Sequence, residues 1–173
     1  MKTYPIRYDA PTVAQHIAQT ARTLQAQGVL TDETVYIVLM NGGCWFAMHL
    51  FDCLGDMHNA VYFVKAHSYD GAERGALSWD YLPEMDLKDK QVVILDDICD
   101  SGETIEACYR YLTEAYSPRS VKALTLLRRS TTRVSDGIEL YSCIVDPTES
   151  FFVGCGLDDY GLGRMLPYVG IIQ

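Results

Sequence analysis

Long apolar runs occur at four places along the chain, each bounded by polar or glycine-containing segments. Such continuous runs rich in β-branched residues are typical of strands that are covered on both faces, as in a parallel sheet. Two shorter strand-like pieces follow later in the sequence. The expected strands are residues 34–40 (TVYIVLM), 60–66 (AVYFVKA), 91–96 (QVVILD), 121–127 (VKALTLL), 139–145 and 151–153.

Three other segments carry apolar residues at the spacing of a helix, namely residues 12–27, 44–55 and 103–116. Gly28 and Gly55 follow the first two, and Pro118 lies just beyond the third, where a helix commonly ends. Residues 67–90 are polar and contain glycine, so we expect a loop there. The alternation predicts an α/β fold, with a mainly parallel sheet flanked by helices.

Polar turns leave three of the expected strands, at residues 41–43, 96–102 and 128–133. In open α/β sheets, ligands bind beyond the carboxyl ends of the strands. We therefore expect these three turns to face one crevice. This convergence is a stronger indication of a site than any one turn.

The composition is that of one domain, residues 1–173, with a sizeable core. A formal charge of −9 argues against a nonspecific nucleic-acid binder or a binder of anionic membranes. No stretch approaches the roughly 18 apolar residues of a membrane span. The 6 cysteines form no C-x-x-C pair, which is typical of free thiols in a reducing compartment. We expect a cytoplasmic protein without a membrane or nucleic-acid partner.

The sequence VVILDDICDSGET, residues 92–104, joins an apolar strand to the start of a helix through three acids, Asp96, Asp97 and Asp100. Amides at a helix start attract a phosphate; Gly102 lets the backbone come close, and Ser101 and Thr104 offer hydroxyls. Neighbouring carboxylates suit a sugar phosphate, because they accept hydrogen bonds from hydroxyls and help to hold Mg²⁺. Taken alone, the pattern is also compatible with a helix-capping Asp100 and solvated strand-end acids.

The same stretch closely resembles the phosphoribosyl-pyrophosphate binding motif of the type I phosphoribosyltransferases. Three further blocks are similar to the hypoxanthine-guanine (6-oxopurine) branch of that family, so that the resemblance covers roughly residues 30–173. They are VLMNGGCWFAMHL at 38–50, the pair Ser68–Tyr69, and FFVGCGLDDYGLGRMLPYVGII at 151–172.

The resemblance implies transfer of a phosphoribosyl group to hypoxanthine or guanine, with Mg²⁺ as cofactor and Asp100 as general base. It implies that phosphoribosyl pyrophosphate is bound by Asn41, Gly42, Ser68, Tyr69, Asp96, Asp97, Asp100, Ser101, Gly102, Glu103, Thr104 and Arg164. The implied purine contacts are Arg129, Phe151, Phe152 and Asp158, and the implied metal ligands are Asp96, Asp97 and Asp158. It also implies a non-proline cis bond at the pyrophosphate turn, a lid at about 67–80, a C-terminal hood at about 139–173, and a homodimer or homotetramer.

Four positions depart from the family pattern, namely Asn41, Glu103, Arg129 and Cys155. Arg129 stands where a lysine usually meets the 6-oxo group, which keeps xanthine open as a substrate, because an arginine fork has a different geometry. A solvated strand-end charge is the alternative for Arg129. Glu103 lies in the phosphate turn, and its side chain should point to solvent because it would repel a phosphate. A nonenzymatic regulator that senses phosphoribosyl pyrophosphate and binds nucleic acid is a rival function, which the acidic composition disfavours.

Overall fold

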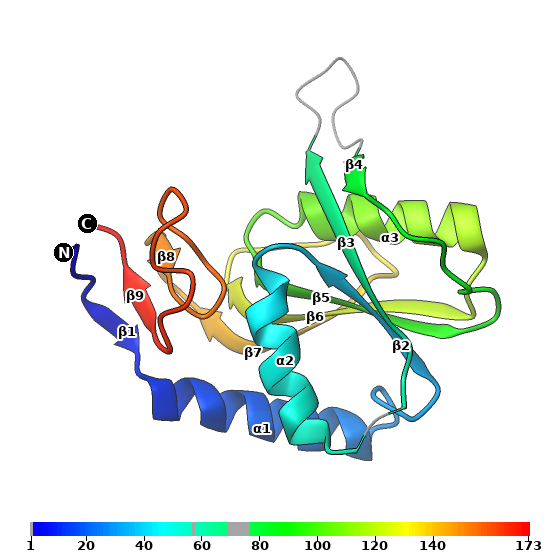
Figure 1. The fold of residues 1–173 in the computed structure, drawn as a ribbon, viewed down its shortest axis with the longest axis horizontal. Helices are drawn as coiled ribbons and strands as arrows, with labels where there is room; N and C mark the ends of the chain where they lie inside the picture. Colours follow the sequence, from blue (N-terminus) through cyan, green and yellow to red (C-terminus); the bar gives the residue numbers. More distant parts are fainter. Residues whose placement is uncertain (1, 57, 69–76) are drawn as a thin grey trace.

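The computed structural model describes residues 2–56, 58–68 and 77–173. Figure 1 shows its elements along the chain. The helices are α1 (Ala10–Ala26), α2 (Gly43–Leu54) and α3 (Glu103–Tyr116). The strands are β1 (Ile6–Tyr8), β2 (Thr34–Leu39), β3 (Val61–Ser68), β4 (Leu77–Tyr81), β5 (Gln91–Cys99), β6 (Ser120–Arg129), β7 (Glu139–Asp146), β8 (Phe152–Val153) and β9 (Val169–Ile171).

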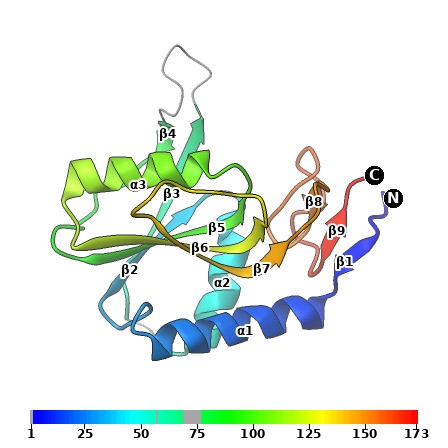
Figure 2. The same ribbon diagram turned by 180° about the vertical axis from the view of Figure 1, so that it is seen from behind.

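The main sheet is six-stranded, in the order β4-β3-β2-β5-β6-β7. All neighbouring strands from β3 to β7 pair in parallel, and β4 pairs antiparallel with β3 at one edge. Helices α1 and α2 lie on one face of this sheet and α3 lies on the other (Figures 1 and 2). The prediction of a mainly parallel sheet flanked by helices is confirmed.

Alternation along the strands builds a core on each side of the sheet. Tyr36 of β2 packs toward α2 with Phe46, whereas the next residue, Ile37, packs in the second cluster with Leu112 of α3. All four side chains are almost fully buried. Both faces of β2 are therefore apolar, which is why its sequence is a continuous apolar run.

Two segments differ from the sequence predictions. Strand β5 continues to Cys99, because its ladder with β6 extends through Ile98 and Cys99, so Asp96 and Asp97 lie within the strand and not in the turn after it. The expected loop is also shorter, since β3 reaches Ser68 and residues 77–81 form β4. Strand β4 has one packed aromatic, Trp79, whose ring centroid lies 4.7 Å from that of Tyr111 on α3.

A second, three-stranded sheet, β1-β9-β8, joins the two ends of the chain (Figure 1). Strand β7 of the segment 139–173 belongs to the main sheet, while β8 and β9 belong to this small sheet. In the described ranges, no helix is both long and apolar enough to cross a membrane.

Asp146, at the end of β7, connects the small sheet to the main one. It is fully buried and accepts hydrogen bonds from Arg7 Nε at 2.8 Å, Tyr8 Oη at 2.6 Å, and the amide and hydroxyl of Thr148 at 2.7 and 2.5 Å. Burial alone would raise the pKa of Asp146, but the hydrogen bonds from Thr148, Tyr8 and Arg7 outweigh it and hold this pKa well below its ordinary value. The charged carboxylate therefore stabilises the fold above pH about 4, and this stabilisation is lost as the pH falls.

We expect Asp146→Ala to lower the free energy of unfolding by about 3 kcal/mol, because it leaves buried donors without their acceptor. In a chain of this length that corresponds to a fall of about 6–12 °C in melting temperature. Calorimetry at pH 7 measures it. The exposed acid Asp136 supplies the control, since Asp136→Ala should change stability by no more than about 0.5 kcal/mol. Equal melting temperatures for the two variants would contradict this role of Asp146.

Candidate active site

The three polar turns that follow β2, β5 and β6 meet at the carboxyl ends of these strands. Gly42 lies so close to Asp97 that a Cβ at position 42 would overlap the Asp97 carboxylate. Arg129, at the end of β6, forms an ion pair with Asp100. The predicted convergence of the three turns is therefore confirmed, since the turns after β2 and β6 contact Asp97 and Asp100 of the β5–α3 segment.

Asp96 and Asp97 are adjacent, half-buried carboxylates. The Asp97 amide donates to Asp96 Oδ1 at 2.9 Å, and the Ile98 amide donates to Asp97 Oδ1 at 2.8 Å. Burial raises the pKa of Asp96 well above its ordinary value, and the negative charge of Asp97 adds to the shift. Burial also raises the pKa of Asp97, although the nearby charge of Arg164 opposes this. A cation beside the pair would reverse this electrostatic cost, so the two acids form an attractive position for one.

The raised pKa of Asp96 should make the free energy of unfolding depend on pH. Because the folded protein holds this proton more tightly than the unfolded chain, Asp96 is stabilising below pH about 4 and loses that contribution as the pH rises through its folded pKa. Asp96→Asn keeps the shape and the acceptor for the Asp97 amide. At pH 7.5 the melting temperature of the variant should be higher than that of the wild type, because the substitution removes a desolvated charge that is repelled by Asp97. Each kcal/mol gained in the free energy of unfolding corresponds to a rise of about 2–4 °C.

Melting scans of both proteins from pH 4 to 8 measure this difference, which should shrink toward pH 4. A difference that stays constant across this range would show that titration of Asp96 does not cause it.

The turn from β5 into α3 encloses a small pocket. Its volume is about 260 Å³, and its lining is formed by Asp96, Asp97, Ile98, Cys99, Asp100, Ser101, Gly102, Thr104 and Ile105. Gly102 has a φ of 97°, and a Cβ there would lie 2.9 Å from the Arg133 carbonyl oxygen, so only glycine fits this position. Glu103 is exposed, as expected from its charge. The amides at the start of α3 and the hydroxyls of the turn form a position suited to a phosphate.

Arg129 is held by three contacts. Its Nε donates to Asp100 Oδ1, its Nη1 donates to the Thr148 carbonyl oxygen at 2.8 Å, and its guanidinium carbon lies 5.5 Å from the centroid of the Phe152 ring. Its side chain is only 8% exposed, whereas that of Asp100 is 57% exposed. The alternative of a solvated strand-end charge for Arg129 is therefore wrong.

Arg164 and Asp158 form a second ion pair, contributed by the segment between β8 and β9. Arg164 also donates to the Gly156 carbonyl oxygen, and Asp158 Oδ2 accepts from the Gly161 amide at 2.6 Å. Gly156 in turn packs on Gly42, since a Cβ at 156 would overlap the Gly42 carbonyl oxygen. This segment therefore lies against the turn after β2, in which the Met40–Asn41 bond is cis.

The two neighbouring aromatic residues Phe151 and Phe152 differ in exposure. Phe151 is 71% exposed, and Phe152 is buried and contacts Arg129. Ser68 is the last residue of β3. Tyr69, and residues 69–76 of the expected lid, lie outside the described residues.

Sequence reasoning missed two residues of the site. Gly156 carries a φ of 106° and supports both Gly42 and Arg164. Thr132 is buried and donates to carbonyl oxygens at the end of β5. The G-x-G spacing of residues 154–156 is a signal for the first, whereas Thr132 has the same sequence signature as any polar turn residue.

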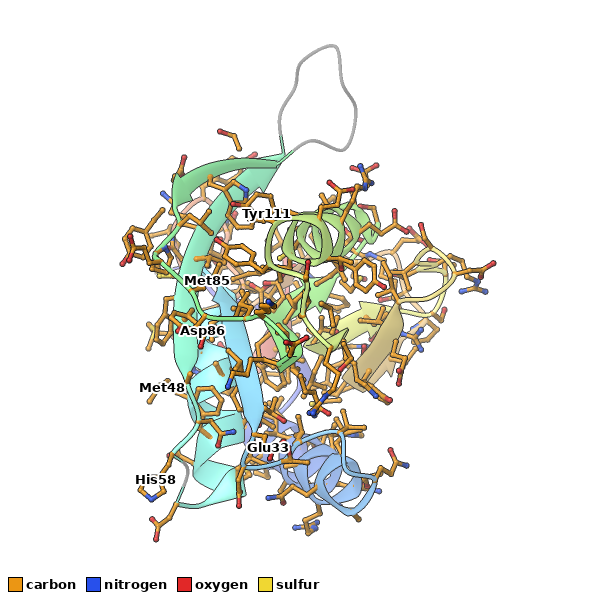
Figure 3. All side chains as sticks on the ribbon, turned by 90° about the vertical axis from the view of Figure 1, so that its right-hand side faces the viewer. Glu33, Met48, His58, Met85, Asp86 and Tyr111 are labelled. Atoms are coloured by element: carbon orange, nitrogen blue, oxygen red, sulfur yellow. The ribbon has the colours of Figure 1, made fainter. Side chains whose placement is uncertain are left out.

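A larger pocket, of about 430 Å³, lies at the amino ends of the strands, near Glu33, His58 and Asp86 (Figure 3). One of its polar side chains already has protein partners, since the Gln91 side-chain amide donates to the Val29 carbonyl oxygen and to the Thr34 hydroxyl. The pocket at the carboxyl ends of the strands is smaller, but its clustered acids and arginines make it the better candidate for the functional site.

Comparison with known proteins identifies the family. The model of the phosphoribosyl transferase domain matches residues 8–160. The hypoxanthine-guanine phosphoribosyltransferase of Streptococcus pneumoniae is 30% identical over 164 residues, which covers 91% of this chain and 88% of that protein. The protein of the same name from Staphylococcus epidermidis is 30% identical over 144 residues, or 80% of this chain and 77% of that protein.

Solved structures agree on the fold. A hypoxanthine phosphoribosyltransferase from Staphylococcus aureus has a TM-score of 0.83 at 23% identity and covers 97% of this chain and 92% of that chain. A hypoxanthine-guanine phosphoribosyltransferase from Bacillus anthracis has a TM-score of 0.82 at 22% identity and covers 100% of both chains. With a family model that matches most of its length, this chain belongs to the phosphoribosyltransferase family and is similar to the hypoxanthine-guanine phosphoribosyltransferases.

Proposed function

We propose that the protein acts in purine salvage, transferring the phosphoribosyl group of phosphoribosyl pyrophosphate to hypoxanthine or guanine. The products are the nucleoside monophosphate and pyrophosphate. The observation that carries this proposal is the convergence of the phosphate turn, the two half-buried acids and the two arginines at one edge of the sheet. Family membership and the names of the relatives support the same reaction.

In this proposal, each part of the crevice binds one part of the donor. The start of α3, residues 101–104, binds the 5-phosphate through main-chain amides and the hydroxyls of Ser101 and Thr104. Asp96 and Asp97 accept hydrogen bonds from the ribose hydroxyls. Arg164 and the main chain of Asn41 and Gly42 bind the pyrophosphate. Ser68 and Tyr69, at the start of the proposed lid, also take part in binding phosphoribosyl pyrophosphate.

The purine lies at the opposite end of the crevice. Phe151 stacks on its ring, main-chain groups of Phe152 and Asp158 contact its edge, and Arg129 donates to its 6-oxo group. As the bond from the anomeric carbon to pyrophosphate breaks, one imidazole nitrogen of the purine forms a bond to that carbon, and the proton that the imidazole ring loses passes to Asp100. In this arrangement the purine lies near the exposed Asp100 carboxylate.

We also propose that Mg²⁺ takes part. In the described part of the chain, no group of three or more His, Cys, Asp and Glu side chains could hold a metal by itself. Mg²⁺ is commonly bound by one or two carboxylates together with substrate phosphates, and the pair Asp96–Asp97 fits that requirement. Asp158 is already paired with Arg164, so its participation requires exchange of that partner. When bound, the metal would neutralise charge that develops on pyrophosphate.

Steady-state assays of the purified protein test the substrate proposal. Hypoxanthine, guanine, xanthine and adenine are compared with phosphoribosyl pyrophosphate and Mg²⁺, and turnover is expected with hypoxanthine or guanine. Preference for xanthine would assign a different specificity to Arg129. No turnover with any 6-oxopurine, combined with RNA or DNA binding at physiological salt, would favour the nonenzymatic regulator.

We further propose that the protein is a cytoplasmic homodimer or homotetramer. The assembly proposed is the one that the family resemblance implies. All of its cysteines are free thiols, as expected in a reducing compartment. Light scattering on a sizing column measures the oligomeric state, and a monomer at micromolar concentration would contradict the proposal.

A further inference from the structure

Asp100 is fixed by the segment that follows β6, and not by its own turn. Its carboxylate is more than half exposed, so packing does not set its direction. The ladder between β5 and β6 ends with the pair Cys99 and Arg128, one residue before Asp100. The contacts that hold Asp100 beyond this point are therefore made by side chains.

The hydroxyl of Thr132 makes one of these contacts. Its Oγ1 lies 3.0 Å from the Cys99 carbonyl oxygen and 2.5 Å from that of Asp100, and the residue is only 4% exposed. The hydroxyl thus contacts the main-chain carbonyl oxygens immediately before and after the Asp100 Cα. A valine or alanine at 132 would leave both carbonyl oxygens without this donor.

Arg129 makes the other contact, to the carboxylate itself. It is in turn anchored to the Thr148 carbonyl oxygen, and Thr148 donates to the buried Asp146. Arg129 and Thr132 are three positions apart, and the amide of Thr132 donates to the Arg129 carbonyl oxygen at 3.2 Å. One hydrogen-bonded turn therefore holds both the main chain and the side chain of Asp100.

We propose that Thr132 is a positioning residue for Asp100, whose hydroxyl sets the direction from which the Asp100 carboxylate meets the purine. This inference rests on the proposed function and deepens it, because it assigns the alignment of the general base to a buried hydroxyl outside the phosphate turn. It follows that loss of the hydroxyl should affect the proton-transfer step more than the binding of phosphoribosyl pyrophosphate, whose phosphate is bound by amides of α3.

The test is a double-mutant cycle between Thr132→Val and Asp100→Asn. We expect Thr132→Val to lower the single-turnover rate about tenfold, the size of one lost hydrogen bond to an aligned group, with less than about a twofold change in KM for phosphoribosyl pyrophosphate. In the Asp100→Asn background the same change should lower the rate less than about twofold, because the group that it aligns no longer accepts the proton. Thr132→Ser, which keeps the hydroxyl, should restore most of the rate.

Two controls separate alignment from damage to the fold. Thr131→Val alters the exposed neighbouring threonine and should leave the rate unchanged. Thr132→Ala replaces Thr132→Val in the cycle if the valine variant melts below the assay temperature. Full additivity with Asp100→Asn, or a serine variant as slow as the valine variant, would overturn the inference while leaving the proposed reaction intact. Absence of turnover in the wild type would overturn both.

Discussion

Replacement of Asp100 by asparagine should lower the single-turnover rate at least tenfold, because general acid–base catalysis typically contributes a factor of about 10²–10⁴. The asparagine side chain keeps an oxygen that can accept from Arg129 Nε, so the geometry of the site is retained while the proton acceptor is lost. KM for phosphoribosyl pyrophosphate should change little. Rapid-quench measurement is the appropriate assay, because slow product release can hide a change in the chemical step.

The matched control is Asp136→Asn, which makes the same substitution at an exposed acid outside the site. Its rate should equal that of the wild type. An Asp100→Asn variant that retains the full single-turnover rate would remove Asp100 from the proton transfer and assign that role to another group.

Gly156→Ala should abolish most of the activity. The alanine Cβ would overlap the Gly42 carbonyl oxygen, and a φ of 106° is unfavourable for any residue with a side chain. Relief of the overlap must move either the turn after β2 or the segment that carries Arg164, since Arg164 donates to the Gly156 carbonyl oxygen. We expect kcat/KM for phosphoribosyl pyrophosphate to fall by about 10²-fold, the effect typical of a misplacement of about 1 Å.

Gly137→Ala is the control that distinguishes the effect of steric overlap from the effect of an unfavourable φ. It has a φ of 97°, but a Cβ there would meet nothing within 4 Å. Gly137→Ala should therefore cost about 1–3 kcal/mol of stability with little change in kcat/KM. Equal losses of activity in the two variants would show that contact with Gly42 is not the cause.

Much of the fold could be predicted from sequence because its main determinants are local or periodic. Strand β2 lies between two layers of helices, so all of its residues are buried and its sequence is continuously apolar. The turn between β5 and α3 could also be predicted, since an apolar strand, Gly102 and the start of a helix follow one another within residues 92–104. The end of β5 could not be located, because acids inside a strand have the same sequence pattern as acids after one.

The convergence of the three turns could be predicted, but the individual contacts between distant residues could not. Strand β1 is only three residues long and Ile6 is 60% exposed, so its conformation depends on pairing with β9 at the other end of the chain. Gly156 meets Gly42 across more than a hundred residues of sequence, and the hydroxyl of Thr132 meets the end of β5. These contacts follow from the topology of the sheet and cannot be inferred from local composition.

The two arginines of the crevice are each occupied by a carboxylate of the same chain, Arg129 by Asp100 and Arg164 by Asp158. Pyrophosphate, which we propose to bind Arg164, would therefore compete with Asp158 for this arginine. The measured affinity of the anion would then reflect how much more strongly the arginine interacts with the anion than with the aspartate that it displaces. Since dissolved salt screens both partners, ionic strength should influence such an exchange less than it would influence capture by solitary arginines.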